Sequence, residues 1–459
     1  MSIFKSCDIR GVYGSELTAE TAYLLGRAVG SRLPGQHVVV GGDLRTSTPA
    51  LKQALIDGLL QSGARVVDIG IVPTPVFYYA KNAWAALGGV MVTASHNPAR
   101  YNGFKIMLGD LPVTPEDLQA LAQQMQAGNF AQGQGTYRRE DILPAYQRAL
   151  TEAFPALQPH QVVVDAGNGC LWSVAPAVLR QTNQQVTELY CTPDGTFPNR
   201  SPNPAVPEHL QALQTVVTQV GADFGAAYDG DGDRVIFVDG RGRVQPADRT
   251  LVLFIRHLLR QQPGAAVVYD LKSSSVVADE VRAAGGQPLQ ERSGHAFIKA
   301  RLLTERAILG GEISGHYFFG ALGGDDALYA TLLLLQVLDD LGTSFAEAMD
   351  TVPVYPITPD LRLPCPRERA QRILDELAAT FAEYPIDTLD GVRVQFPDGW
   401  ALARISVTEP LLTLRFEAHS QEALQEIQAQ VLRRSPLLAE LYAEQGHSPS
   451  QPHESENGQ

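Results

Sequence analysis

The sequence has few cysteines, and it lacks long apolar runs and a surplus of positive charge. Its four cysteines are scattered among 459 residues, and none forms a C-x-x-C pair with the spacing of metal ligands. We therefore expect reduced thiols in a cytoplasmic protein. The formal net charge of −14 repels nucleic acid and anionic membranes. An anionic ligand would need a locally basic pocket, and a phosphorylated metabolite fits this pattern better than DNA.

Signals for export or membrane insertion are also missing. The opening residues, MSIFKSCDIR, are polar and charged, without the apolar stretch of a secretory signal. No apolar run approaches the roughly 20 residues that span a bilayer. The sequence thus predicts a cytoplasmic protein that binds neither membranes nor nucleic acid. Its oligomeric state stays open, with a monomer among the options.

Length and composition indicate a folded chain of several domains. At roughly 100–200 residues per domain, about three or four domains are expected. Apolar residues make up 44% of the chain and charged residues 19%, which is ordinary for a globular protein. The chain can therefore bury a sizeable core.

One strand pattern recurs three times along the chain. The copies are HVVVGGDLRTST from His37, QVVVDAGNGC from Gln161 and AAVVYDLKSSS from Ala265. Each is a short apolar run that ends in small polar residues, as buried parallel strands do before a loop and a helix. A second strand candidate follows in each copy, and then a third, GGVMV, DFGAAY or RAILG, which runs into a polar motif. This repetition predicts three α/β domains of related topology.

We place these three domains at residues 1–145, 146–242 and 243–352, with mixed, mostly parallel sheets. EDILPAYQRALTEAF is expected to connect the first domain to the second, and VDGRGRVQPADRT the second to the third. Between residues 353 and 445, strands such as GVRVQF and LLTLRFEA accompany helices, which predicts a smaller α+β domain with a partly antiparallel sheet. Residues 446–459 are rich in Pro, Ser and Gln and are predicted to be a disordered tail.

The motif DGDGDR is the strongest chemical signal. Its alternating glycines let Asp229, Asp231 and Asp233 point at one centre, which suits a hard cation with oxygen ligands. A calcium EF-hand loop is disfavoured, because Arg234 stands where that loop requires glycine and Gly240 where it requires glutamate. Magnesium fits better, since it needs few carboxylates plus a phosphate oxygen. A solvated acidic turn is the plainer alternative, and we rank it well behind the metal site.

TASHNP follows the strand candidate GGVMV and places Ser95 at a strand-to-loop turn. Most serines in such positions only cap a helix or turn. A serine there could equally be a nucleophile, because backbone N–H groups of a following helix would stabilise a phosphoryl group on its oxygen. His96 beside it is a weak signal when it is taken alone.

Two further motifs could bind the two ends of a sugar phosphate. GEISGH sets glycines around Glu312 and Ser314, so that a carboxylate and a hydroxyl can approach sugar hydroxyls. RISVTEP offers a cation and two hydroxyls for a phosphate dianion, namely Arg404, Ser406 and Thr408. Ordinary surface turns remain an alternative for both motifs when each is considered singly.

One motif in each domain, each at the end of a strand, is far less expected by chance than any single motif. With TASHNP, DGDGDR, GEISGH and R-x-S-x-T-x-P in this order, the chain resembles the α-D-phosphohexomutases, and among them the bacterial phosphomannomutase/phosphoglucomutase branch. The resemblance runs from FKSCDIRG at Phe4 to LRFEA at Leu414. It implies four domains around one cleft and an enzyme that interconverts hexose 1-phosphate and hexose 6-phosphate, with glucose or mannose as the sugar.

The resemblance also implies roles for the matching residues. Ser95 would carry the phosphoryl group and, with Asp229, Asp231 and Asp233, would bind Mg²⁺. Transfer from Ser95 would give hexose 1,6-bisphosphate, which reorients and returns its other phosphate to the serine. The residues implied for catalysis beside Ser95 are Arg10, His96, Lys105 and His316. Those implied for substrate binding are Arg234, Lys272, His295, Lys299, Glu312, Ser314, Arg404, Ser406 and Thr408.

Two positions depart from the family pattern, and the substrate stays open. Cys7 stands where the family often has tyrosine, and Val407 where glucose and mannose mutases usually have asparagine. Ile313 favours the glucose/mannose branch over glucosamine mutases, which usually have glutamine there. Phosphoglucosamine mutase is the second candidate. A sugar phosphatase and a non-catalytic sugar-phosphate sensor are less favoured alternatives.

Overall fold

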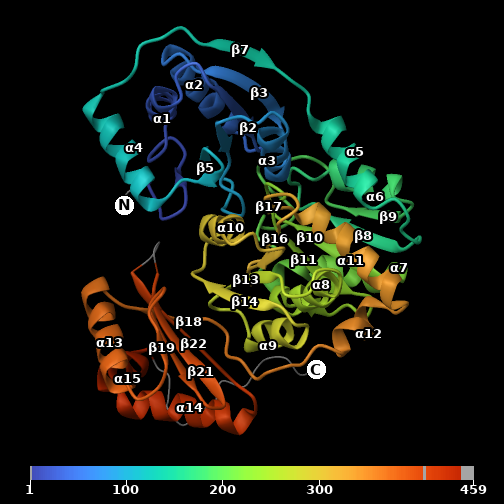
Figure 1. Ribbon diagram of the computed structural model, residues 1–459, viewed down its shortest axis with the longest axis vertical. Helices are drawn as coiled ribbons and strands as arrows, with labels where there is room; N and C mark the ends of the chain where they lie inside the picture. The colour runs from blue at the N-terminus through green and yellow to red at the C-terminus, as the bar shows by residue number, and fades with distance from the viewer. Residues whose placement is uncertain (1–2, 407–409, 446–459) are drawn as a thin grey trace.

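The three recurring segments form three sheets with the same strand order (Figure 1). In the computed structural model, which describes residues 3–406 and 410–445, the first strand of each copy lies between the second and third, and all three are parallel. The repeat that the sequence predicts is therefore confirmed. These strands are β2 (His37–Gly42), β3 (Arg65–Ile71) and β4 (Gly88–Val92); β8 (Gln161–Asp165), β9 (Gln185–Leu189) and β10 (Phe224–Tyr228); and β13 (Ala266–Asp270), β14 (Gln287–Glu291) and β15 (Leu309–Gly311).

In every copy the third strand also starts an antiparallel hairpin. Its returning strand is β5 (Tyr101–Leu108), β11 (Val235–Asp239) or β16 (Tyr317–Phe319). TASHNP, DGDGDR and GEISGH are the loops of these three hairpins. The sheets are consequently mixed, with a parallel centre and an antiparallel side. Short strands complete them: β1 (Ile9–Val12), β6 (Leu111–Pro112), β7 (Thr136–Arg139), β12 (Val244–Gln245) and β17 (Gly324–Asp325).

Helices connect the parallel strands and cover the sheets. Several carry the caps that fix helix starts: Thr114 and Asp117 form a capping box, and Asp326 accepts from two backbone N–H groups. The helices of the first three domains are α1 (Ala19–Arg32), α2 (Thr48–Gln61), α3 (Thr74–Ala83), α4 (Pro115–Ala127), α5 (Leu143–Ala153), α6 (Val174–Gln181), η1 (Pro207–Leu210), α7 (Gln211–Val220), α8 (Ala247–Gln261), α9 (Ser275–Ala283), α10 (His295–Thr304), α11 (Ala327–Leu341) and α12 (Phe345–Asp350).

The C-terminal domain has a sheet in which all neighbouring strands are antiparallel. Burial alternates along strand 392–396, as expected when one face packs on helices and the other does not. The predicted α+β domain is confirmed. Its elements are β18 (Leu361–Pro364), α13 (Arg367–Thr380), β19 (Ile386–Asp387), β20 (Val392–Phe396), β21 (Gly399–Ile405), β22 (Leu411–Ala418), α14 (Gln421–Arg434) and α15 (Pro436–Glu444).

The apolar cores divide the molecule into a large block and a smaller unit. One continuous core runs through parts of the first three domains, whereas the C-terminal domain has a core of its own. That domain lies beside the third one in Figure 1. A small apolar cluster of Leu271, Trp400 and Leu402 joins the two. The first three domains thus share their packing, and the fourth is attached through a limited contact.

The structure does not test every prediction about domain boundaries, the tail and the phosphate-binding loop. β12 pairs with β11, so the second sheet continues to residue 245, and the predicted domain boundaries stay predictions. The predicted tail at 446–459, Val407 and Thr408 lie outside the described residues. In the described ranges, no helix combines the length and the apolar character needed to cross a membrane.

The contact between the third and fourth domains depends on Trp400. Its Nε1 donates to Ser275 Oγ at 3.0 Å and to Glu417 Oε1 at 2.8 Å. Trp400→Phe removes this donor beside a carboxylate that is 1% exposed, which should cost about 1–3 kcal/mol. We expect faster limited proteolysis of the fourth domain. Trp172→Phe, at a partly exposed tryptophan, is the control, and equal cleavage rates in the two variants would contradict the assignment.

Candidate active site

The three hairpin loops meet around DGDGDR. Ser95 Oγ donates a hydrogen bond to Asp229 Oδ2 at 2.7 Å, which joins the first loop to the second. The backbone N of Val235 donates to Gly315 O at 3.0 Å, which joins the second loop to the third. The predicted grouping of the three motifs is therefore found in the structure.

Ser95 is fully buried and has an uncommon backbone conformation. Its φ of 50° lies in the left-handed region, which non-glycine residues rarely adopt. The Ser95 N–H donates to Thr93 Oγ1 at 2.8 Å, and its carbonyl accepts from Arg45 at 2.7 Å. The surrounding bonds thus hold the hydroxyl toward Asp229.

Arg45 stabilises the backbone of this loop, although the sequence analysis did not name it as a candidate site residue. Its guanidinium, fully buried, pairs with Asp43 at 3.0 Å and also donates to four backbone carbonyls of residues 95–101. Its position in DLRTST, directly after the first repeated strand, is the one sequence feature that could have marked Arg45 as a site residue.

The DGDGDR loop needs its glycines because it approaches Ser95 closely. A Cβ on Gly230 would lie 2.6 Å from the Ser95 carbonyl oxygen, and Gly232 has a φ of +78°. The tight turn lets Asp229 Oδ1 accept from the backbone N of Gly232 at 2.9 Å and of Asp233 at 3.1 Å. Only glycine permits both features.

The three carboxylates form a site that fits a cation. Ligand oxygens of Asp229, Asp231 and Asp233 lie within 4.8 Å of one another, and all three residues are buried. Asp231 Oδ1 has no hydrogen-bond partner among the described residues, and the nearest partner of Asp233 Oδ1 is His316 Nε2 at 3.2 Å. Burial, and then the charges of Asp231 and Asp233, raise the pKa of Asp229 well above its usual range. A bound divalent cation would use these oxygens and relieve that repulsion.

Lys105 supplies the nearest positive charge. Its Nζ donates to Asp231 Oδ2 at 2.8 Å and to Asp233 Oδ2. Burial alone would lower the pKa of Lys105, but the two aspartates raise it well above its usual range. Thr74, at the start of α3, also donates to Asp231 Oδ2, at 2.7 Å. Sequence reasoning found the lysine and missed the threonine.

Arg10 and His96 flank the serine. Arg10 donates to Asn97 Oδ1 at 2.6 Å and pairs with Asp8 at 2.8 Å. His96 Nδ1 lies 3.2 Å from Ser95 Oγ. Burial, followed by the charges of Arg234 and Arg10, lowers the pKa of His96 well below its usual range. His96 is therefore neutral, and Arg10 keeps its charge.

GEISGH contributes a carboxylate and an imidazole, Glu312 and His316, which contact each other. His316 Nδ1 donates to Glu312 Oε2 at 2.8 Å, and its Nε2 lies 3.2 Å from Asp233 Oδ1. Burial and Arg234 would lower the pKa of His316, but Asp233 and Glu312 raise it to about 9. Burial would raise the pKa of Glu312, but its hydrogen bond from His316 lowers it to about 2. Ser314 Oγ also donates to Glu312, at 3.0 Å.

The other third-domain residues fall into two places. His295 stacks on His316 with ring centroids 6.0 Å apart, so it belongs to the cluster. Lys299 instead lies over the ring of Tyr78, 3.1 Å from its centroid. Asp325, which the sequence analysis missed, is buried with Oδ2 3.6 Å from His316 Nε2.

The expected phosphate-binding cations are paired with carboxylates of the fourth domain. Lys272 Nζ donates to Asp360 Oδ2 at 2.6 Å, and Arg404 lies 2.7 Å from Asp390. The backbone N of Ser406 donates to Leu411 O at 2.9 Å. No contact in the described residues links Lys272 or Arg404 to Ser95.

Comparisons with known proteins match the whole architecture. Family models described as phosphoglucomutase/phosphomannomutase α/β/α domains I, II and III match residues 1–132, 144–242 and 246–355, and the model of the C-terminal domain matches 361–434. A phosphomannomutase/phosphoglucomutase of Pseudomonas aeruginosa is 41% identical over 93% of this chain and 94% of its own. A phosphoglucomutase of Neisseria gonorrhoeae is 39% identical over 93% and 95%.

The solved structures agree with the sequence relatives. The crystal structure of a phosphoglucomutase/phosphomannomutase family protein from Burkholderia thailandensis has a TM-score of 0.89 and 38% identity. The match covers 95% of this chain and 97% of that one.

Arg45 should be essential for the stability of the serine loop. Arg45→Met would leave Asp43 buried without its cation and four carbonyls without their donor, for which a loss of about 3–5 kcal/mol is expected. Urea unfolding measures this loss. Arg65→Met, at an exposed arginine of β3, should change the free energy of unfolding by less than about 0.5 kcal/mol. A similarly small effect at Arg45 would mean that the loop does not depend on it.

Proposed function

The chain belongs to the phosphoglucomutase/phosphomannomutase family, and from that membership we propose that it interconverts hexose 1-phosphate and hexose 6-phosphate of glucose and mannose. It is an enzyme that transfers a phosphoryl group within a sugar phosphate. The observation that carries the proposed mechanism is the buried Ser95 hydroxyl, 2.7 Å from Asp229 inside a cluster of acids and bases.

In the proposed reaction, phosphorylated Ser95 is the resting donor. The free hydroxyl of the sugar loses its proton as its oxygen attacks the phosphorus, the bond to Ser95 Oγ breaks, and Ser95 Oγ takes up a proton, which gives hexose 1,6-bisphosphate and free serine. After the bisphosphate turns round, Ser95 Oγ attacks its other phosphate and releases the isomeric monophosphate. Burial of Ser95 supports this scheme, because exclusion of water protects the phosphoserine from hydrolysis.

The basic residues near Ser95 fit roles in charge stabilisation and proton transfer. Lys105 and Arg10 would stabilise the phosphoryl oxygens as charge redistributes. His316, with a pKa of about 9, holds a proton at neutral pH on a ring that faces Asp233 and Glu312. Neutral His96, with Nδ1 3.2 Å from Ser95 Oγ, can hydrogen-bond with that oxygen without adding charge.

Asp229, Asp231 and Asp233 are the residues that would hold Mg²⁺. The buried Asp231 Oδ1, which has no hydrogen-bond partner among the described residues, supports this assignment. A bound Mg²⁺ would neutralise part of the phosphoryl charge.

Glu312 and Ser314 are proposed to recognise the sugar hydroxyls. Glu312 is buried, and its pKa of about 2 keeps it ionised, so it can accept a hydrogen bond from a sugar hydroxyl. Glucosamine phosphate stays the second candidate substrate, and Ile313 favours glucose and mannose.

Lys272, Arg404, Ser406 and Thr408 are proposed to bind the distal phosphate. Asp360 and Asp390 now pair with the two cations, so a phosphate dianion would have to replace these carboxylates. Motion of the fourth domain, which has its own core, would accompany this exchange. We also propose a cytoplasmic location, consistent with four free cysteines.

Replacing the serine tests the function. Wild-type protein with Mg²⁺ and a trace of glucose 1,6-bisphosphate should convert glucose 1-phosphate and mannose 1-phosphate to their 6-phosphates. Ser95→Ala should lose at least about 10³-fold in turnover, because alanine has no oxygen to carry the phosphoryl group. The control is Ser173→Ala, whose serine makes no side-chain cap to α6. Normal turnover by Ser95→Ala would exclude the phosphoserine route.

Metal binding can be measured apart from activity. Asp231→Asn removes one charge from the triad and should weaken Mn²⁺ binding, followed by electron paramagnetic resonance, by more than about tenfold. Asp375→Asn removes an exposed carboxylate of α13 and should leave the affinity unchanged. Equal affinities in the two variants would place the cation elsewhere.

A further inference from the structure

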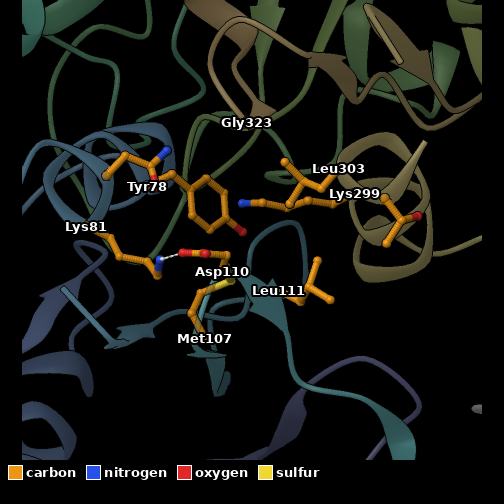
Figure 2. A pocket seen from close by; sticks show the side chains of 10 residues that line it. Tyr78, Lys81, Met107, Asp110, Leu111, Lys299, Leu303 and Gly323 are labelled. Atoms are coloured by element: carbon orange, nitrogen blue, oxygen red, sulfur yellow. Dashed lines mark hydrogen bonds and ion pairs between the residues drawn. The ribbon is translucent and has the colours of Figure 1, made fainter. Parts of the chain in front are cut away.

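A cavity of about 410 Å³ lies between the first and third domains, outside the acid cluster (Figure 2). α3 contributes Tyr78 and Lys81 to its wall, and the β5–β6 hairpin contributes Met107 and Leu111. α10 provides Lys299 and Leu303. Ser95, the three aspartates and Glu312 are not part of the lining. The cavity has the size of small-molecule sites, about 300–1,000 Å³.

Two buried lysines line the cavity. The Lys81 side chain is 3% exposed, and its Nζ lies 3.3 Å from Asp110, whose side chain is 98% exposed. Lys299 is 1% exposed, and its Nζ faces the Tyr78 ring in Figure 2. In the part of the chain that the structure describes, no hydrogen bond or ion pair reaches Lys299 Nζ. Only one aspartate therefore opposes two lysines in the lining.

A buried ammonium group without a hydrogen-bonded partner is costly. Burial is the main reason that the pKa of Lys299 falls to about 7, although Asp325 opposes the shift. The Asp110 carboxylate, being almost fully exposed, gains little from its pair with Lys81. An anion that entered the cavity could meet Lys299 and replace Asp110 on Lys81, while an apolar body covered Met107, Leu111 and Leu303.

We propose that this cavity is a second ligand site, which binds a small organic anion through Lys81 and Lys299. The ligand carries a carboxylate or a phosphate on an apolar or aromatic body. Because its contacts come from both the first and the third domain, binding holds these domains together. Because the ligand binds the folded protein, it raises the free energy of unfolding by an amount that grows with the logarithm of its concentration above Kd.

The test uses benzoate and phenyl phosphate as probes of the two acid groups, titrated calorimetrically into the Mg²⁺-loaded full-length protein. At least one probe should bind. Its affinity should rise about two- to fivefold in Asp110→Asn, which removes the competing carboxylate, and fall at least about tenfold in Lys81→Met. Asp57→Asn makes the same charge change on an exposed side chain of α2 and should have no effect.

The two probes show whether the natural ligand carries a carboxylate or a phosphate. Binding of benzoate alone identifies a carboxylate ligand, and cavity-dependent binding of phenyl phosphate alone identifies a phosphate ligand. Thr304→Trp, at the exposed end of α10, should fill the cavity and abolish probe binding. This variant replaces Lys81→Met in the test if Lys81→Met does not fold. The proposal is overturned if neither probe binds below about 10 mM. It is equally overturned if binding is unchanged when Lys81 and Thr304 are replaced.

Discussion

Three buried carboxylates on one short loop set the main physical constraint on this molecule. Asp229, Asp231 and Asp233 are each no more than 1% exposed, and a buried charge without compensation costs several kcal/mol of folding free energy. Lys105 is placed against two of these carboxylates, and protonated His316 lies against Asp233. The positive groups that compensate this loop are also those proposed to assist phosphoryl transfer. Under that proposal, stability and chemistry depend on the same contacts.

The repeated topology explains why these groups meet. Each of the first three domains turns its antiparallel hairpin at the end of a central strand, and the shared core fixes the three hairpins relative to one another. Ser95 can then be held at a positive φ by Arg45 and Thr93. The fourth domain has a separate core and supplies Asp360 and Asp390, so its pairs with Lys272 and Arg404 can change without disturbing the serine loop.

Local patterns predicted the features that depend on local sequence. The strands before TASHNP, DGDGDR and GEISGH are short apolar runs, and the glycines of DGDGDR signal a tight turn, so both the repeat and the acid cluster were found. Contacts between distant segments could not be found in this way. Arg45 binds carbonyls about 50 residues away, and Lys299 meets Tyr78 across a domain boundary. Asp325 belongs to no recognisable motif, and only its 3.6 Å distance to His316 Nε2 places it in the acid cluster.

Transfer of a labelled phosphoryl group tests the central claim most directly. Purified enzyme with Mg²⁺ is incubated with ³²P-labelled glucose 1,6-bisphosphate, digested, and analysed for the labelled peptide. We expect label on Ser95 and its loss to sugar phosphate when unlabelled glucose 1-phosphate is added before digestion. A label on another residue, or a label on Ser95 that glucose 1-phosphate does not remove, would contradict the account.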